Sequence, residues 1–227
     1  MSVLFLIPAR AGSRGLPGKN TKMLGDKPLV AYSIDFALSN LKPGDELCVS
    51  TNDAEVINVA NARGVKVSFV RPDNLATDTA SSYDVIMHAL EFYEKEGKFF
   101  DWLLLLQPTS PFRVQKDIIQ LFDAIEYEVE MVVTVKKVKE NPYFSLFEEN
   151  TEGFLVKSKQ GDYHRRQDCP EVFAYNGSMY LFKVSALKNN PINRLRRIKK
   201  VVMPLSRSVD IDTMEDWILA EYYLKLQ

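Results

Sequence analysis

The sequence predicts an α/β protein of three layers, α/β/α, in which helices cover a mostly parallel β-sheet that carries a small β-rich arm. Short apolar runs bounded by turn residues alternate with segments of helical periodicity, which is the pattern of β-α-β units. The chain has 227 residues, of which 46% are hydrophobic, enough to bury one such core. We therefore expect a single main domain with one excursion.

Strands are expected where short apolar runs are bounded by turn residues. They are predicted at residues 3–7, 47–51, 65–70, 102–107, 131–135, 178–182 and 201–205. Apolar residues at helical spacing predict helices within residues 30–41, 56–60 and 85–93. A last helix, from about residue 213 to 226, is expected to bury Trp217, Ile218 and Leu224 against the sheet.

Residues 139–175 interrupt this alternation, because they show no clean helical pattern and are punctuated by proline and glycine. We interpret them as an inserted β-rich arm between the two parts of the main domain, residues 1–138 and 176–227. The arm is too apolar for a solvated loop, with Tyr143, Phe144, Leu146, Phe147, Phe154 and Leu155. A second copy of the chain is the simplest partner for these side chains, and a flexible lid is the alternative.

Composition excludes several classes of function. The net charge is −1, from 29 basic and 30 acidic residues, so no overall positive field attracts nucleic acid. The basic run at residues 194–200 contains no interleaved aromatic residues and is interpreted as a solvated loop or an oligomer contact. Cys48 and Cys169 lie far apart, without metal-ligand spacing. Because the first apolar run is too short for a signal peptide or a membrane span, we expect a cytoplasmic protein with no membrane partner.

The loop from Pro8 to Asn20 follows the first predicted strand and is rich in glycine, including Gly12, and in cations. Glycine lets backbone N–H groups approach a phosphate closely, and Arg10, Arg14 and Lys19 supply positive charge. The loop matches neither the P-loop motif nor the dinucleotide-binding glycine pattern. The alternative is a basic surface turn. Because open α/β sheets bind ligands where their strands end, we predict a phosphate-binding loop of a nucleotide-using transferase.

Further motifs accompany this loop along the chain, in one order. They are Lys19-Asn20, Arg71-Pro72, Gln107-Pro108-Thr109-Ser110-Pro111-Phe112-Arg113, Asn176-Gly177-Ser178-Met179-Tyr180 and Asp210-Ile211-Asp212. Together they resemble the CMP-sialic acid synthetases, the N-acylneuraminate cytidylyltransferases, over essentially the whole chain. The resemblance implies a Rossmann-like fold of the nucleotide-diphospho-sugar transferase type, with residues 1–138 and 176–227 as the catalytic domain.

The resemblance also implies an activity. The anomeric hydroxyl of a nine-carbon 2-keto sugar acid, by default N-acetylneuraminic acid, attacks the α-phosphate of CTP, giving a CMP-sugar and pyrophosphate. Mg²⁺ is the implied cofactor. The implied assembly is a homodimer through the 139–175 arm, with a tetramer left open. Positioning and charge neutralisation carry most of the rate in such transfers.

Residue by residue, the resemblance assigns the nucleotide to the loop. Arg10, Arg14 and Lys19 match the cations that hold the triphosphate, Gly12 and Ser13 lie between them, and Asn20 lies beside the nucleotide. Arg71 and Ser82 match positions near the cytidine and its phosphates. For these last two, a turn-capping or helix-capping role is the alternative.

The resemblance assigns the acceptor sugar to three other residues. Gln107 ends a very apolar strand, and its amide can both donate to and accept from sugar hydroxyls. Its alternative role is to bond the following turn. Arg166 matches an arginine that contacts the sugar, although Arg165 is equally placed, and Tyr180 matches a tyrosine of the sugar pocket.

Asp210 and Asp212 are the predicted metal ligands. Residues two apart in an extended segment face the same side, so both carboxylates can reach one hard cation, and Mg²⁺ prefers one or two carboxylates with phosphate oxygens and waters. Asp210 is also a candidate base, acting through a water. The competing interpretation is that Asp212 is a helix N-cap, with Glu215 completing a capping box.

The chain departs from the family pattern at a few positions. Ala11 and Arg14 stand where glycine and lysine are usual, and Asn141 stands where many relatives have histidine. A family lysine that reaches the pyrophosphate from the neighbouring subunit has no clear match; Lys136, Lys137 and Lys139 are candidates. Two alternatives stay open: a synthetase that activates the eight-carbon sugar Kdo, and a noncatalytic nucleotide- or sugar-binding module.

Overall fold

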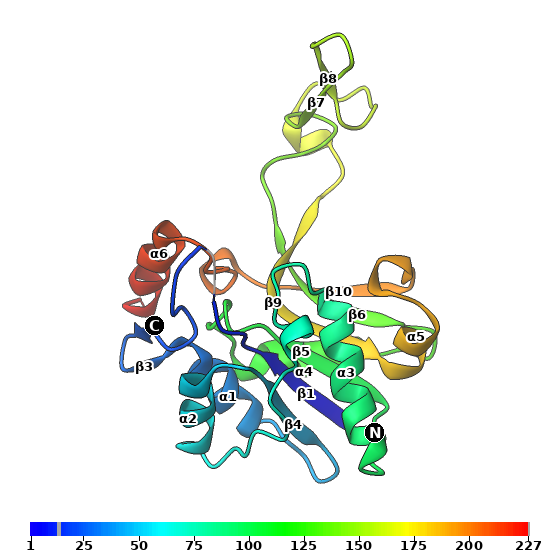
Figure 1. Ribbon diagram of the computed structural model, residues 1–227. Coiled ribbons are helices and arrows are strands. Elements are labelled where there is room, and N and C mark those ends of the chain that lie inside the picture. Colours follow the sequence, from blue (N-terminus) through cyan, green and yellow to red (C-terminus); the bar gives the residue numbers. More distant parts are fainter. Residues whose placement is uncertain (13–14, 227) are drawn as a thin grey trace.

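A six-stranded sheet with helices on both faces forms the centre of the computed structural model, which describes residues 1–12 and 15–226 (Figure 1). The strand order is β10-β6-β9-β5-β1-β4. Parallel pairs join β1 to β4 and β5, and β6 to β10, whereas β9 runs antiparallel to β5 and β6. The bounds are Val3–Pro8 (β1), Glu46–Ser50 (β4), Trp102–Leu106 (β5), Met131–Lys137 (β6), Phe173–Lys183 (β9) and Ile198–Val202 (β10).

Two hydrophobic cores lie on the two faces of this sheet. One face packs against α1, α2 and α4, and the other packs against α3 and α5. The helix bounds are Leu29–Leu38 (α1), Ala54–Asn61 (α2), Ser82–Lys95 (α3), Gln115–Asp123 (α4) and Val184–Asn189 (α5). The predicted α/β/α class is therefore confirmed.

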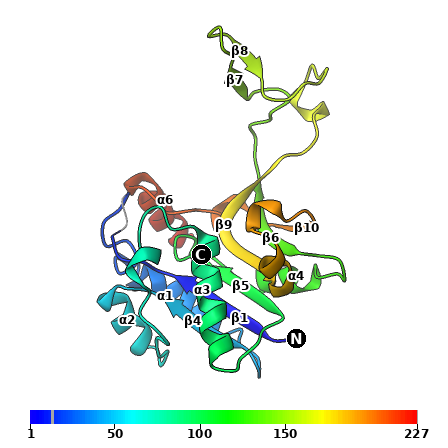
Figure 2. The same cartoon turned by 45° about the vertical axis from the view of Figure 1, so that its right-hand side comes forward.

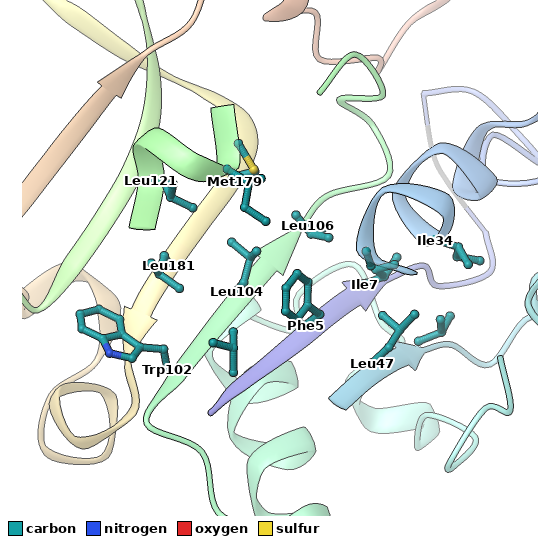
Figure 3. Packing of buried hydrophobic residues seen from close by; sticks show 14 of the residues in the cluster. Phe5, Ile7, Ile34, Leu47, Trp102, Leu104, Leu106, Leu121, Met179 and Leu181 are labelled. Atoms are coloured by element: carbon teal, nitrogen blue, oxygen red, sulfur yellow. The ribbon is translucent and has the colours of Figure 1, made fainter. Parts of the chain in front are cut away.

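The central position of β1 in the sheet explains why its sequence is continuously apolar. Phe5 and Ile7 belong to the first core and Leu4 and Leu6 to the second, so a central strand covered on both sides has no solvent face. Figure 3 shows the first core along β4, β1, β5 and β9, with Ile34 of α1 and Leu121 of α4 closing it. The parallel strands β4, β1 and β5 end at one edge of the sheet, and polar residues that follow them belong to the predicted site.

The C-terminal helix α6, Met214–Leu224, belongs to a third cluster. Its Trp217 is buried against loop residues such as Leu16 and Ile211 rather than against the sheet. Ile218 is 60% exposed, so its predicted burial is wrong. The short strands β2 (Met23–Leu24) and β3 (Lys27–Pro28) pair with each other beside this cluster. Because α6 packs on the N-terminal loop, the two ends of the chain support each other.

The structure corrects the predicted elements at several places. Residues 65–70 form only an isolated bridge, Thr51 to Val70, because Ser68 bonds the Tyr93 hydroxyl and Phe69 packs on α3 instead of building a ladder. The last strand is Ile198–Val202 rather than 201–205; exposed lysines on this edge hid its start, and Pro204 follows its end. The helices α4 and α5 were not predicted.

The arm rises away from the sheet in both views (Figures 1 and 2). Its far end carries a short antiparallel hairpin of β7, Phe147–Glu149, and β8, Leu155–Lys157. The strand β9 begins at Phe173, inside the stretch predicted as arm, and pairs there with β6. Short 3₁₀ turns lie at Asp73–Leu75 (η1), Arg166–Asp168 (η2), Ile192–Arg194 (η3) and Leu205–Arg207 (η4).

A separate test concerns membranes. Within the part of the chain that the structure describes, no helix has the length and apolarity to cross a bilayer.

Candidate active site

The loop after β1 is tied to the core at both of its ends. The Ala9 and Ala11 N–H groups donate to the Ser50 carbonyl and the Asn52 side chain, each at 2.9 Å. The buried Asn20 amide donates back to the Arg10 carbonyl at 3.1 Å. Asn20, predicted beside the nucleotide, therefore holds the loop closed in this structure. Ser13 and Arg14 lie outside the described residues.

Three predicted nucleotide-binding residues converge beside the first turn of α3. Arg10, Arg71 and Ser82 line one cavity of about 170 Å³. Arg10 pairs with the Asp78 carboxylate, and its Nη1 also donates to the Gly12 carbonyl at 3.0 Å. The cavity therefore combines two cations with the positive end of a helix, which suits an anion.

Arg71 is buried, and its Nε donates to Ser50 Oγ at 3.0 Å. Burial lowers the pKa of Arg71 to about 10, and the nearby charge of Arg10 acts in the same direction. The guanidinium nevertheless stays protonated at neutral pH. Ser81, not Ser82, caps α3 by accepting from the Asp84 N–H, so Ser82 is free of the capping role.

The second wall of the site is the segment Asp210–Asp212, and Lys19 joins it to the loop. The buried Lys19 Nζ donates to the Ile211 carbonyl at 2.7 Å and to Asp212 Oδ1 at 2.8 Å. The loop also comes very close to this segment at Gly15, where an added Cβ would lie 2.1 Å from the Asp212 carbonyl oxygen. A side chain at position 15 would therefore push the two walls apart.

Ile211 fixes the segment between its two carboxylates. Its side chain is fully buried and its N–H donates to the Thr109 carbonyl at 2.8 Å. Asp210 and Asp212 flank this anchor, and both are exposed. Although Asp210 is open to solvent, protein surrounds it on most sides, and this burial raises the pKa of its carboxyl group. The charge of Asp212 raises this pKa further, whereas Thr109 and Lys19 lower it. The charge of Asp212 therefore acts on Asp210.

The structure contradicts the proposed capping role of Asp212. Thr213 is the N-cap of α6, and Asp216 completes the capping box: Thr213 Oγ1 accepts from the Asp216 N–H at 3.3 Å, and Asp216 accepts from the Thr213 N–H at 2.9 Å. The prediction missed this by one residue because Asp212 and Thr213 are both good cap residues. Asp212 is therefore available for another role.

The donor set around Asp210 fits a hard cation such as Mg²⁺. Two carboxylates are present, and the Thr109 hydroxyl beside them acts on Asp210 as a hydrogen-bond donor. Among the described residues no group of three or more His, Cys, Asp or Glu side chains forms a closed metal site. Any metal here would need ligands from a substrate or from water.

The predicted acceptor residues Gln107 and Tyr180 lie on the neighbouring strands β5 and β9. Gln107 follows the last residue of β5 and is half-buried, and its side-chain amide makes no hydrogen bond within the described part of the chain. Burial raises the pKa of Tyr180 to about 12, and the Asp210 charge adds to this rise. Tyr180 also stacks on Phe182, at 6.3 Å between ring centroids. Gln107 is the freer of the two to bind a ligand.

Gly177 links this acceptor side to the carboxylates. It has a φ of +75°, and an added Cβ would lie 2.8 Å from Asp210 Oδ2 and 3.1 Å from Ser110 Oγ. Two features therefore require glycine at this position: the positive φ and the close approach of Asp210 and Ser110. Asp210 thus lies directly against β9.

Arg166 lies apart from the other predicted residues. It is exposed, begins η2 on the arm and lines a groove of about 680 Å³ together with Val202 and Leu205. Arg165 is the engaged member of the pair, because its guanidinium binds both Asp168 oxygens at 2.8 and 3.0 Å. Within the described residues, no contact joins Arg166 to Gln107, Tyr180 or Asp210.

Two buried polar residues were missed as parts of the site. Arg113 donates to the carbonyl groups of Gln107 and Ser178. Asn176 accepts from Thr134 Oγ1 at 2.8 Å and donates to Ser208 Oγ at 3.0 Å. Both stand in motifs quoted for the resemblance, without a role. Their polar side chains inside otherwise apolar or turn sequences are the only signal that the sequence offers.

Comparisons with known proteins agree with this geometry. A family model described as Cytidylyltransferase matches residues 4–224. A CMP-N,N′-diacetyllegionaminic acid synthase from Legionella pneumophila is 35% identical over 233 residues, which cover 100% of this chain and 97% of the relative.

Two further similarities extend the comparison. An N-acylneuraminate cytidylyltransferase from Streptococcus agalactiae serotype V is 32% identical over 96% of this chain, which matches 52% of that relative. Among solved structures, a CMP:2-keto-3-deoxy-manno-octonic acid synthetase complexed with CTP superposes with a TM-score of 0.73 at 18% identity, covering 100% of this chain and 99% of the other. That structural similarity concerns the fold.

Proposed function

The chain belongs to the cytidylyltransferase family, and from this membership we propose that it transfers the cytidylyl group of CTP to a nine-carbon 2-keto sugar acid. The observation that carries the proposal is the junction of the two walls. Lys19 of the phosphate loop binds Asp212, and Gly177 of the acceptor strand touches Asp210. The residues that we propose for the triphosphate, the metal and the acceptor therefore meet at one edge of the sheet.

We assign the nucleotide to the loop and to the cavity beside α3. Arg10, Arg71 and Lys19 offset the charge of the triphosphate, and Ser82 in the first turn of α3 adds N-terminal helix polarity. Arg10 exchanges Asp78 for phosphate oxygens on binding. Gly12, with a φ of +72°, allows the loop backbone to turn toward the anion.

In the proposed reaction, the anomeric hydroxyl oxygen forms a bond to the α-phosphorus of CTP. The bond from that phosphorus to the bridging oxygen breaks, and pyrophosphate leaves with the electron pair. Asp210 accepts the hydroxyl proton through a water. Asp210 and Asp212 would hold Mg²⁺, which when bound neutralises phosphate charge and favours ionisation of an approaching hydroxyl.

The identity of the sugar is the finer part of the proposal. We place N,N′-diacetyllegionaminic acid first, because the relative named for it is 35% identical to this chain, against 32% for the N-acylneuraminate relative. N-acetylneuraminic acid stays the prediction from the sequence. Gln107 is the side chain we propose to contact the sugar, because its amide has no other partner within the described residues.

Pyrophosphate release from CTP tests the proposal. The assay contains Mg²⁺ and one of four acids: N,N′-diacetyllegionaminic, N-acetylneuraminic, deaminated neuraminic, or the eight-carbon Kdo. We expect turnover with at least one nine-carbon acid, and loss of turnover when EDTA removes the metal. Turnover with Kdo alone would reassign the enzyme to the Kdo group. CTP binding without turnover on any acid would leave a noncatalytic binding module.

We also propose that the arm forms a homodimer and carries Arg166 to the active site of the partner. Five apolar residues on the arm are at least 41% exposed: Leu146, Phe147, Phe154, Leu155 and Val156. A patch of this kind needs a covering surface. Arg166 lies on the same arm, and within the described residues no hydrogen bond or ion pair joins it to Gln107, Tyr180 or Asp210. A second copy meets both requirements.

Subunit mixing tests this arrangement. Arg166→Ala and Asp210→Asn are each expected to be nearly inactive. In a two-fold dimer that shares its sites, unfolding and refolding an equal mixture gives about half heterodimers, each with one intact site, so about a quarter of wild-type activity should return. Recovery of no activity, or a monomer in sedimentation analysis of the wild-type protein, would contradict the proposal.

A further inference from the structure

Arg113 is a buried guanidinium that binds backbone carbonyl groups instead of a carboxylate. Its Nε and Nη2 donate to the Ser178 carbonyl at 3.2 and 2.8 Å, and Nη2 also donates to the Gln107 carbonyl. Its Nη1 donates to Ser33 Oγ at 2.9 Å. The side chain thus joins the end of β5, the middle of β9 and the helix α1.

The groups that Arg113 joins are those that bear the acceptor side of the site. Gln107 carries the free amide, and the Ser178 carbonyl lies next to Gly177, which touches Asp210. The backbone hydrogen bond at this junction is long: the last pair of the β5–β9 ladder is Leu106 with Met179, and the Gln107 N–H reaches the Ser178 carbonyl at 3.4 Å. The guanidinium therefore supplies the short contacts at the point where the two strands carry their functional residues.

This arrangement costs free energy of folding, so stability alone does not account for it. Burying a guanidinium removes its hydration, and a well-packed apolar side chain often serves stability as well. Burial lowers the pKa of Arg113 to about 9, with the charges of Asp117 and Asp210 opposing the shift, so the group remains charged at neutral pH. The planar guanidinium of Arg113 binds three oxygens at once and so fixes their relative positions, which the single charged group of a lysine would not do.

We propose that Arg113 is a positioning residue for the acceptor sugar, whose fork holds the Gln107 and Ser178 carbonyls so that the Gln107 amide and Asp210 face the same substrate. This inference rests on the proposed cytidylyl transfer. It concerns the acceptor alone, since the contacts of Arg113 lie on β5, β9 and α1 and none involves the loop cations.

The test compares Arg113→Lys and Arg113→Met with wild type in two measurements. Calorimetry with CTP gives the nucleotide Kd, and the pyrophosphate assay gives kcat and the KM for the sugar acid. A displacement of about 1 Å at a reacting group costs up to about 100-fold in rate. We expect kcat/KM for the sugar to fall at least about tenfold in both variants while the CTP Kd stays within about twofold. Lysine keeps the charge without the fork, so it should not rescue.

Two controls separate positioning from folding. Arg63→Met removes a half-buried guanidinium that binds Asp35 Oδ1 at 2.9 Å, far from the sheet edge, and should leave the sugar KM unchanged. Thermal melting of each variant fixes a temperature at which all are folded. In a double-mutant cycle, Arg113→Lys should have a smaller effect in Gln107→Ala than in wild type, because part of its effect acts through the Gln107 amide.

The outcomes are distinct. Wild-type kinetics in Arg113→Lys, equal losses for CTP and sugar, or full additivity with Gln107→Ala would each overturn the inference while cytidylyl transfer stands. If wild type itself turns over no sugar acid, the proposed function falls and this inference falls with it.

Discussion

Replacing Asp210 by asparagine is expected to lower kcat for pyrophosphate release by about 10³-fold, while CTP binding is largely kept. Asparagine has nearly the same shape, so the close approach to Gly177 survives. What disappears is one of two carboxylate charges proposed to hold Mg²⁺ and the group proposed to take the hydroxyl proton. Single-turnover kinetics with radiolabelled CTP would measure the loss directly, and calorimetry would measure nucleotide affinity.

The matched control is Asp216→Asn, six residues further along the chain. Asp216 accepts from the N–H groups of Asp212 and Thr213 in the capping box of α6, so its loss affects the helix. Removing such a cap typically costs about 1 kcal/mol of stability, and activity should change little at a temperature where the protein is folded. Near-normal turnover in Asp210→Asn would remove this residue from catalysis.

The parts of the site that sequence reasoning predicted share one property. Arg10 follows β1, Arg71 follows the isolated bridge of Val70 to Thr51, and Ser82 begins α3. Because the carboxyl ends of parallel strands meet at one edge, order along the chain predicts nearness in space. The same logic predicted the sheet itself. A buried parallel strand reveals itself by a continuous apolar run, as in Val3–Pro8.

What the sequence could not predict depends on side-chain partners from distant elements. Residues 65–70 have a strand-like pattern, yet Ser68 and Phe69 are held by α3 rather than by a β ladder. In the sequence, Arg113 looks like a positively charged turn residue. In the structure its side chain is buried and binds backbone carbonyl groups, because β5, β9 and α1 surround it. Local patterns do not contain such contacts.

The position of Arg166 shows a different limit. The resemblance assigned it to the acceptor sugar with Gln107 and Tyr180, but within the described residues of one chain no hydrogen bond or ion pair joins Arg166 to either of them. If a second copy completes the site, Arg166 has the role that the resemblance assigned to it, but the site of a single chain lacks it. A sequence cannot state which copy supplies a residue.

Lys19→Met provides the second large effect, because Lys19 has two available partners. In this structure its ammonium is buried and binds Asp212 and the Ile211 carbonyl, and in the proposed complex it also balances the triphosphate. Methionine keeps much of the length and packing but not the charge. We expect kcat/KM for CTP to fall by about 10² to 10³, the cost of removing one preorganised donor.

The exposed Lys22, two residues beyond the loop, gives the control. Its ammonium lies 5.0 Å from the Trp217 ring centroid, so Lys22→Met should change kcat/KM for CTP less than about twofold. The Mg²⁺ requirement separates the two roles of Lys19. If the lysine chiefly holds Asp212 for the metal, its loss raises the Mg²⁺ concentration needed for half-maximal rate. If it chiefly balances the triphosphate, removing a cation 2.8 Å from Asp212 leaves that concentration equal or lower, which is the result we expect.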